Sequence, residues 1–279
     1  MGWTAEQRRL LFRYDAALPL DVVSGARTQD DGLLIERLTF ASTHDQRVPA
    51  VLYRRASTER PPVVIVGHGA GGSKDDPLMD RLFRWLAEHG LAVAAIDAPF
   101  HGERHERFED FRDLLRQPFR GLHFVVQSVV DTMRAVDWLQ TRDDLDAARI
   151  GYLGLSMGTI LGVPFVGMDA RISAAVFALG GAGVLHFLAG LAAPEVRPAA
   201  ERVAEALDPM HYAPLIAPRP VLMVNGARDE IMPPAVGHLL YGLLGEPKRI
   251  IWYEGGHGDV PPEVIGEVRA FFAEALAAA

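Results

Sequence analysis

A serine in a tight-turn motif is the first residue of this sequence whose setting suits chemistry. Ser156 lies in Gly154-Leu155-Ser156-Met157-Gly158, after an apolar run and before a stretch compatible with a helix. That succession predicts a strand, a sharp turn and a helix, and such a turn holds the serine hydroxyl clear of the sheet in a strained backbone conformation. Ser156 is therefore the candidate nucleophile; the alternative is a small residue that merely fits the turn.

An aspartate and a histidine follow at positions that could complete a catalytic triad. A serine hydroxyl needs a base within hydrogen-bond reach, and the base needs an acid that fixes its tautomer. Asp229 comes just after one predicted buried strand, and His257 comes just after the next. The order Ser156, Asp229, His257 is typical of one class of triad enzymes. A histidine base also predicts activity that rises with pH through about 6 to 7.

Each of the two later residues also has a purely structural interpretation. Asp229 could cap the helix predicted to begin near Pro233, and Glu230 would then be the rival acid. His257 could order its glycine-rich loop without taking part in chemistry. Both residues nevertheless occupy loops at the carboxyl ends of predicted strands, which favours the catalytic interpretation.

The elements that would carry these residues alternate between strand and helix. Compact apolar runs predict strands, and apolar residues at helical spacing predict the helices between them. Such units predict an α/β fold with a mostly parallel central sheet, helices on both faces and a site at the carboxyl ends of the strands. The expected strands are 62–67, 92–96, the run before Ser156, 172–179, 219–226 and 249–253, and the expected helices are 77–89, 121–140, 233–244 and 261–276.

Three segments lie outside this alternation. Residues 4–18 predict a short amphipathic helix, and residues 33–40 and 48–54 predict an antiparallel hairpin at a sheet edge. Residues 103–118 are expected to form a surface loop or short helix near the site. Residues 181–215 contain a helical stretch near 194–207 and no obvious strand, so we expect a small helical cap within a single domain that spans residues 1–279.

Several motifs resemble the α/β-hydrolase superfamily, specifically bacterial serine carboxylesterases related to the dienelactone hydrolase family. The resemblance extends from about residue 33 to the end and is carried by the Ser156 motif, the Asp229 and His257 loops, His68-Gly69-Ala70-Gly71-Gly72 and Asp97-Ala98-Pro99-Phe100-His101-Gly102. It implies an α/β-hydrolase fold, and an oxyanion hole formed by the backbone N–H groups of Ala70 and Met157. Dienelactone hydrolases themselves use cysteine, which this chain lacks, so the resemblance implies a serine esterase instead.

Two residues near the motif depart from the family pattern. Thr159 stands where relatives often have a second glycine, and Pro164 is expected to bend or shorten the helix that follows. Neither change removes a catalytic atom. Both concern the local shape of the pocket.

Composition excludes several other classes of function. The net charge is −8, so no overall positive field favours nucleic acid. The chain has no cysteine, which excludes disulfides and thiolate metal sites. The first residues lack the apolar core of a signal peptide, and no run reaches membrane-spanning length, so we expect a cytoplasmic protein with no membrane partner. The oligomeric state stays open, with a homodimer as one option.

No cofactor and no metal ion are expected. The glycine-rich loop after His68 matches neither phosphate-binding glycine pattern, and the histidines show no metal-ligand spacing. His68 and His101 are expected to order tight turns, and His105, His211 and Asp97 are weaker candidates for chemistry. The basic residues from Arg104 to Arg120 are interleaved with acids and indicate a solvated face.

The function expected from these observations is hydrolysis of small, soluble, short-chain acyl esters through an acyl-enzyme. The same triad also serves hydrolysis of C–C, amide or thioester bonds and cofactor-free perhydrolysis, and the fold does not choose among them. A non-catalytic ligand-binding protein on the same scaffold is a third possibility. A complete triad argues against it, because a binding protein needs no such set of residues.

Overall fold

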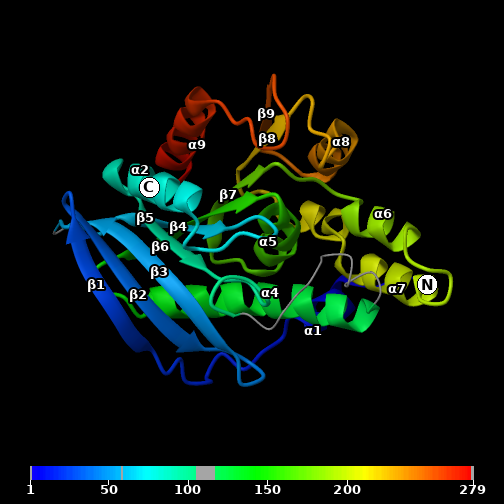
Figure 1. The fold of residues 1–279 in the computed structure, drawn as a ribbon, viewed down its shortest axis with the longest axis horizontal. Helices are drawn as coiled ribbons and strands as arrows, with labels where there is room; N and C mark the ends of the chain where they lie inside the picture. The colour runs from blue at the N-terminus through cyan, green and yellow to red at the C-terminus, as the bar shows by residue number, and fades with distance from the viewer. Residues whose placement is uncertain (1, 58, 105–116, 278–279) are drawn as a thin grey trace.

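The structure is a computed structural model that describes residues 2–57, 59–104 and 117–277. Its centre is a nine-stranded sheet in the order β1-β2-β3-β5-β4-β6-β7-β8-β9 (Figure 1). The strands are β1 (Val23–Asp30), β2 (Leu33–Ala41), β3 (Arg47–Arg55), β4 (Pro62–Gly67), β5 (Ala92–Ile96), β6 (Asp146–Leu155), β7 (Ile172–Ala178), β8 (Val221–Gly226) and β9 (Lys248–Tyr253).

Strand direction divides the sheet into two parts. The pairs β1–β2, β2–β3 and β3–β5 are antiparallel, whereas every pair from β5 across to β9 is parallel. The parallel strands β4, β5 and β8 are buried on both faces, which is why their sequences are largely continuous apolar runs. Because their carboxyl ends meet at one edge of the sheet, the loops after β4, β6, β8 and β9 lie together. We call this end of the sheet the catalytic edge, because the candidate catalytic residues Ser156, Asp229 and His257 follow β6, β8 and β9 there.

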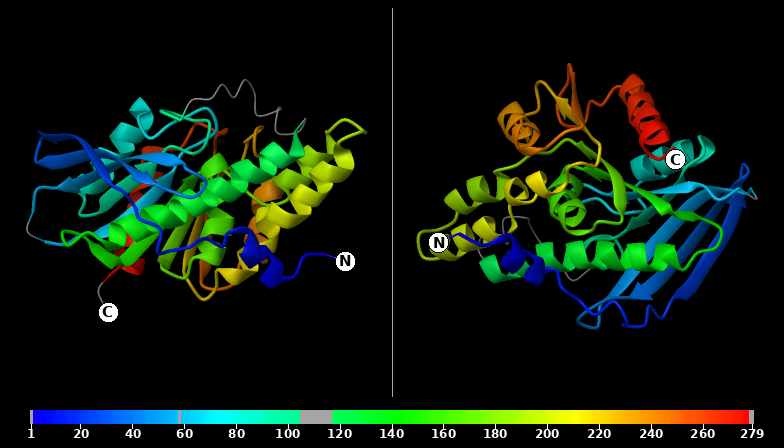
Figure 2. Two further views of the ribbon diagram at one scale, coloured as in Figure 1. Left: turned by 90° about the horizontal axis from the view of Figure 1, so that it is seen from below. Right: turned by 180° about the vertical axis from the view of Figure 1, so that it is seen from behind.

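Helices cover both faces of the sheet. They are α1 (Ala5–Leu11), α2 (Pro77–Glu88), α4 (Pro118–Gln140), α5 (Met157–Met168), α6 (Val184–Gly190), α7 (Arg197–Leu207), α8 (Pro234–Leu243) and α9 (Pro262–Ala275), with 3-10 turns η1 (Pro209–His211) and η2 (Ala213–Leu215). Helices α2 and α9 pack on one face, and α4, α5 and α8 pack on the other. Figure 2 shows α1 lying beside α4 and α7 at the end of the molecule farthest from β1.

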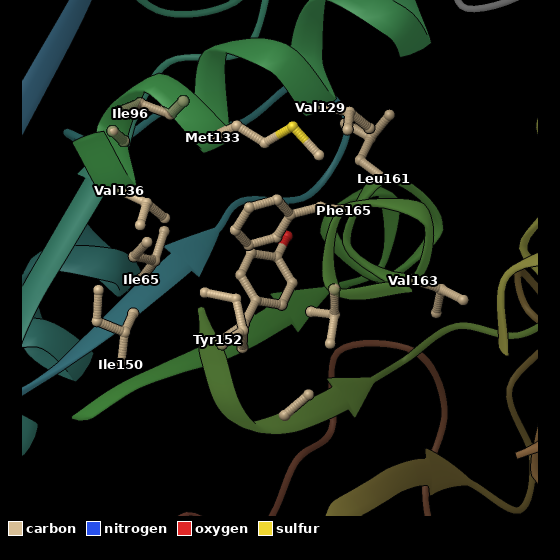
Figure 3. Close-up of a cluster of buried hydrophobic side chains, with 14 of the residues drawn as sticks. Ile65, Ile96, Val129, Met133, Val136, Ile150, Tyr152, Leu161, Val163 and Phe165 are labelled. Atoms are coloured by element: carbon tan, nitrogen blue, oxygen red, sulfur yellow. The ribbon is translucent and has the colours of Figure 1, made fainter. Parts of the chain in front are cut away.

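The two faces hold separate apolar cores. The larger core lies between the sheet and α4 and α5, and Tyr152 stands at its centre with its ring edge-on to Phe165 at a centroid distance of 5.3 Å (Figure 3). The second core packs Phe83 of α2 and Phe272 of α9 against the opposite face. A sheet that is apolar on both sides therefore places α5, which carries the residues after Ser156, on a rigid base.

The α/β-hydrolase architecture expected from the sequence is confirmed, with corrections to three of its elements. The hairpin of β2 and β3 is not at the sheet edge, because β1 pairs outside β2. Strand β1 could not be predicted from the sequence, because all of its residues are exposed and show no apolar alternation. The N-terminal helix ends at Leu11 rather than residue 18, and helix α6 within 181–215 is additional. Within the expected 103–118 segment, residues 105–116 lie outside the described part of the chain.

No helix in the described part of the chain is long and apolar enough to cross a membrane.

Candidate active site

Ser156 sits in a strained turn between β6 and α5. Its φ is +55°, a left-handed conformation that a non-glycine residue rarely adopts. Its N–H donates to Ala178 O at 2.9 Å, so the turn is tied to the end of β7. A Cβ atom at Gly154 would lie 2.5 Å from Gly158 O, and one at Gly158 would collide with Gly67 O. The motif glycines are therefore required by the close approach of strand and helix.

The structure brings the three candidate catalytic side chains into one hydrogen-bonded chain. Ser156 Oγ lies 2.9 Å from His257 Nε2, and His257 Nδ1 lies 2.7 Å from Asp229 Oδ2. The Asp229 carboxylate is fully buried, whereas the His257 ring keeps about a fifth of its surface exposed. A buried carboxylate behind a partly exposed imidazole has the arrangement required to fix the tautomer of a base that faces the serine hydroxyl.

Asp229 has the capping role that the sequence offers as an alternative and also contacts the histidine. Its Oδ1 accepts hydrogen bonds from Ile231 N at 2.9 Å and Met232 N at 2.8 Å, while its Oδ2 contacts His257. The rival acid, Glu230, is exposed. Asp229 therefore caps the turn through Oδ1 and contacts the imidazole through Oδ2. The hydrogen bonds of the cap fix the carboxylate so that Oδ2 points at His257.

The loops that carry Asp229 and His257 are hydrogen-bonded to each other. Ala227 N donates to Tyr253 O at 2.9 Å, and Arg228 N donates to Gly255 O at 3.0 Å. The Tyr253 hydroxyl donates to Gly256 O, one residue before His257, at 2.8 Å. Burial, and then the charge of Asp229, raise the pKa of Tyr253 to about 12, so this phenol stays protonated and keeps donating. Tyr253 is a positioning residue that sequence reasoning missed.

The two candidate oxyanion donors flank Ser156. Met157 is the first residue of α5, and Ala70 is an exposed residue of the loop after β4. A Cβ built on Gly69 would lie 3.7 Å from Ser156 Cβ, which places this loop directly beside the serine. Within the described residues, neither the Ala70 nor the Met157 N–H donates a hydrogen bond to the protein. Both donors are therefore available to a bound group.

His68 links the loop after β4 to the loop after β5. Ala98 N donates to His68 Nε2 at 3.1 Å, so Nδ1 carries the proton and donates to Gly69 O at 2.8 Å. Burial lowers the pKa of His68, which keeps the ring neutral in this tautomer. The ring centroid of His101 lies 5.1 Å away. His68 thus orders the proposed oxyanion loop, as its glycine-turn setting suggests.

A buried lysine, which the sequence did not single out, anchors the other end of the same loop. The ammonium group of Lys74 contacts Asp75 at 2.6 Å, Asp97 at 3.1 Å and Glu103. Burial alone would lower the pKa of Lys74, but hydrogen bonds to these carboxylates raise it above its usual value. The charged lysine therefore holds the glycine-rich loop against the Asp97 loop.

The expectation that the basic residues from Arg104 to Arg120 form a solvated face is wrong for Arg104. Its side chain is buried and forms an ion pair with the fully buried Asp131 of α4 at 2.6 Å. Its second guanidinium nitrogen donates to Gln46 at 2.9 Å. Local composition indicates a solvated residue, but the fold encloses this one between α4 and the β2–β3 hairpin. His105 lies outside the described residues.

Comparison with known proteins identifies the family. The dienelactone hydrolase family matches residues 48–265, which is more than half of the chain. The chain belongs to the dienelactone hydrolase family. A lactone is a cyclic carboxylic ester, and the protein is accordingly a carboxylic ester hydrolase. A relative in Bacillus subtilis (strain 168), YtaP, is named as a hydrolase and is 27% identical over 249 residues, which cover 82% of each chain.

Solved structures similar to this dienelactone hydrolase family member share its fold. An acetyl xylan esterase from Paenibacillus sp. R4 has a TM-score of 0.78 at 21% identity, with 97% of this chain and 93% of the other covered. A cold-adapted esterase from an Arctic intertidal metagenomic library has a TM-score of 0.73 at 22% identity, with 91% and 98% covered. At such identities the likeness establishes the architecture alone.

The two departures from the family pattern have structural explanations. The fully buried Thr159 hydroxyl lies 2.9 Å from Gly154 O and 2.7 Å from Ala178 O, so it ties α5 to the ends of β6 and β7. Pro164 lies inside α5, which continues to Met168. Of the two effects expected of Pro164, shortening is wrong, since the helix runs four residues beyond it, and a bend stays a prediction.

Proposed function

We propose that this family member is a serine esterase that works through an acyl-enzyme. The observation that carries the proposal is the hydrogen-bonded chain from Ser156 through His257 to Asp229. His257 takes the Ser156 proton as Oγ bonds to the carbonyl carbon of the ester. The bond from that carbon to the alcohol oxygen then breaks, and His257 gives the proton to the leaving alcohol. Asp229 stays ionised and stabilises the imidazolium.

The second half of the reaction releases the acid. His257 removes a proton from water as the water oxygen bonds to the acyl carbon, and the bond to Ser156 Oγ breaks as the proton returns to the serine. In both halves the negative oxygen of the tetrahedral intermediate accepts hydrogen bonds from the N–H groups of Ala70 and Met157. Such preorganised donors typically contribute about 3 to 4 kcal/mol each to transition-state stabilisation.

The acyl group is proposed to be short and apolar. A pocket beside Met157 is lined almost entirely by apolar side chains of α4, α5, α6 and α7, among them Phe124, Leu161, Leu188 and Ala200. Its cavity volume is about 60 Å³, and at 10 to 15 Å³ per group it holds roughly four to six water-sized groups. We infer that the 181–215 segment acts as a cap whose helices close this pocket over the acyl chain.

Covalent labelling of the serine tests the proposal. Wild type and Ser156→Ala are treated with an organophosphonate ester probe, analysed by mass spectrometry and assayed on a chromogenic acetate ester. We expect labelling at Ser156 alone and a loss of turnover of about 10⁴-fold or more in the variant. Absence of both labelling and turnover in the wild type would leave a ligand-binding protein as the better interpretation.

The size of the pocket is tested separately by acyl chain length. We expect kcat/KM to be highest for acyl groups of about four to six carbons, as the pocket volume suggests. Leu188→Ala enlarges the pocket and should shift the preference to longer chains, whereas Ala200→Leu fills it and should shift the preference to acetate. Identical chain-length profiles for both variants and the wild type would place the acyl chain elsewhere.

A further inference from the structure

Helices α6 and α7 pack together at the end of the molecule farthest from β1 (Figure 1). Two histidines and a glutamate of this region place their possible ligand atoms close together. His186 comes from α6, Glu205 from α7 and His211 from η1. One ligand atom of each residue lies within 4.8 Å of the other two. His186 and His211 are 25 positions apart in the chain, so no local spacing marks them as a pair.

The unsatisfied nitrogen of His211 points to a missing ligand. His211 Nε2 is buried and has no hydrogen-bond partner among the residues that the structure describes. It lies 3.8 Å from Glu205 Oε2, which is too far for a hydrogen bond. Two ligands on one tetrahedral ion with bonds of about 2.1 Å are separated by about 3.4 Å. A shift of a few tenths of an ångström would therefore let both atoms bind one cation.

A single buried carboxylate holds the backbone that carries the two histidines. Asp208 accepts hydrogen bonds from Gly183 N at 2.8 Å and Leu185 N at 2.9 Å, at the start of the helix that contains His186. It also accepts from Met210 N at 3.0 Å, directly before His211. Because one side chain fixes both segments, the imidazole rings are held together before any ligand binds, which lowers the entropic cost of binding.

The surrounding charges leave one glutamate oxygen facing the histidines. The nearest charged groups are Glu205, Asp208 and the guanidinium of Arg8, which lies 3.6 Å from Glu205 Oε1. Oε2, the other oxygen, faces His211.

Another cluster of possible metal ligands, formed by carboxylates alone, differs from the His186 cluster in what lies at its centre. Asp75, Asp97 and Glu103 also place their oxygens close together. Their centre is already filled by the ammonium group of Lys74, which neutralises them. At the His186 cluster, in contrast, the nearby cation Arg8 lies beside Oε1 of Glu205, while the other carboxylate oxygen, Oε2, faces His211.

We propose that His186, Glu205 and His211 bind a divalent transition-metal ion such as Zn²⁺. Two imidazoles and one carboxylate are ligands that suit zinc, and water completes the coordination of a three-ligand site. The ion joins α6, α7 and η1 and so stabilises the 181–215 segment. The site contains none of the proposed catalytic residues, so its role is structural and the inference does not depend on the proposed esterase mechanism.

Zinc titration of chelator-treated protein tests the site. Isothermal titration calorimetry with ZnCl₂ should show one equivalent bound by the wild type. His186→Gln and His211→Gln should each weaken that binding by at least about tenfold. His238→Gln, which removes an exposed histidine whose ring contacts Trp252, should bind as the wild type does. At zinc concentrations 100 times Kd, the Tm of the wild type should rise by roughly 5 °C or more.

Cobalt substitution provides a direct readout of the ligands. Co²⁺ at a four-coordinate site absorbs visible light strongly, so the wild type should develop bands that Glu205→Gln and His186→Gln lack. Because the side chains of Glu205 and His186 are both partly exposed, we expect these variants to fold. Far-ultraviolet circular dichroism checks that they do. The proposal is overturned if the wild type binds no equivalent of zinc, or if the ligand variants and His238→Gln bind it equally tightly, which would place the ion elsewhere.

Discussion

The catalytic edge and the 181–215 segment are held together in different ways. At the catalytic edge, Ser156, Asp229 and His257 follow the ends of strands, and backbone hydrogen bonds join the loops of Asp229 and His257. The buried Lys74 ties the loop after β4 to the Asp97 loop at the same edge. The 181–215 segment packs α6 against α7 through a small apolar cluster of its own, formed mainly by Ala189, Ala192, Ala200 and Ala204. Its polar anchor is the fully buried Asp208.

Because the two regions are held together differently, we expect the catalytic edge to govern reactivity and the 181–215 segment to govern selectivity among substrates. Groups at the catalytic edge are positioned by strained backbone, close glycine packing and buried charge, all of which tolerate little change. The pocket wall contributed by α6 and α7 consists of apolar side chains such as Leu188 and Ala200, whose substitution alters the shape of the pocket without touching the triad. We therefore expect substitutions at the edge to affect chemistry or global stability, and substitutions in the segment to affect substrate choice.

The largest effect is expected from the acid of the triad. Asp229→Asn should lower kcat by about 10⁴-fold, because the amide no longer fixes the correct tautomer of His257. The neighbouring Glu230→Gln is the matched control, since Glu230 is exposed and should leave kcat close to the wild-type value. Steady-state kinetics on the chromogenic acetate ester measure both. A loss smaller than tenfold for Asp229→Asn would show that Asp229 serves as a cap alone.

The buried lysine at the catalytic edge should dominate global stability. Lys74→Met leaves the fully buried Asp97 without its cation, and the expected cost is about 3 to 5 kcal/mol of unfolding free energy. Arg84→Met is the control, because Arg84 pairs with Asp30 and Asp80 at the surface and should cost at most about 1 kcal/mol. Urea denaturation measures the two values. Equal costs would contradict a special role for the buried pair.

Removal of the anchor of the 181–215 segment tests the other side of the comparison. Asp208→Ala leaves the amides of Gly183, Leu185 and Met210 without their shared acceptor, at an expected cost of about 2 to 3 kcal/mol. Labelling of Ser156 by the organophosphonate should persist, while selectivity among acyl chain lengths should broaden. Loss of labelling in folded Asp208→Ala protein would mean that the segment also positions the triad.

Acidification should produce the smallest effect. The pKa of His68 is lowered by burial, so below the unfolded-state pKa the unfolded chain takes up a proton that the folded chain does not. Stability is therefore complete above about pH 6.5 and falls as the pH decreases, by at most about 1.4 kcal/mol per histidine at pH 5.5. Urea unfolding at pH 7.5 and 5.5 should show this loss in the wild type and a smaller one in His68→Asn. If the wild type and His68→Asn lose the same unfolding free energy between pH 7.5 and 5.5, the pH dependence belongs to other groups.

Much of the fold could be predicted from the sequence because its signals are local. Strands β4, β5, β8 and β9 are compact apolar runs, and the turn at Ser156 requires glycines that the motif displays directly. In contrast, β1 is exposed along its length and is held by backbone pairing with β2, which leaves no pattern in its side chains. Helix α6 is short and begins in glycine-rich sequence, so its periodicity is too brief to recognise.

The sequence by itself determined the α/β architecture, the family and the order of the three candidate catalytic residues, because apolar periodicity, glycine motifs and chain order are properties of short segments. Only the tertiary structure decided which charges are buried and which side chains meet. Arg104 and Lys74 look like ordinary surface cations in the sequence, yet the fold encloses both. His186 and His211 form a pair because Asp208 brings α6 and η1 together, and such long-range burial and pairing are not encoded in local spacing.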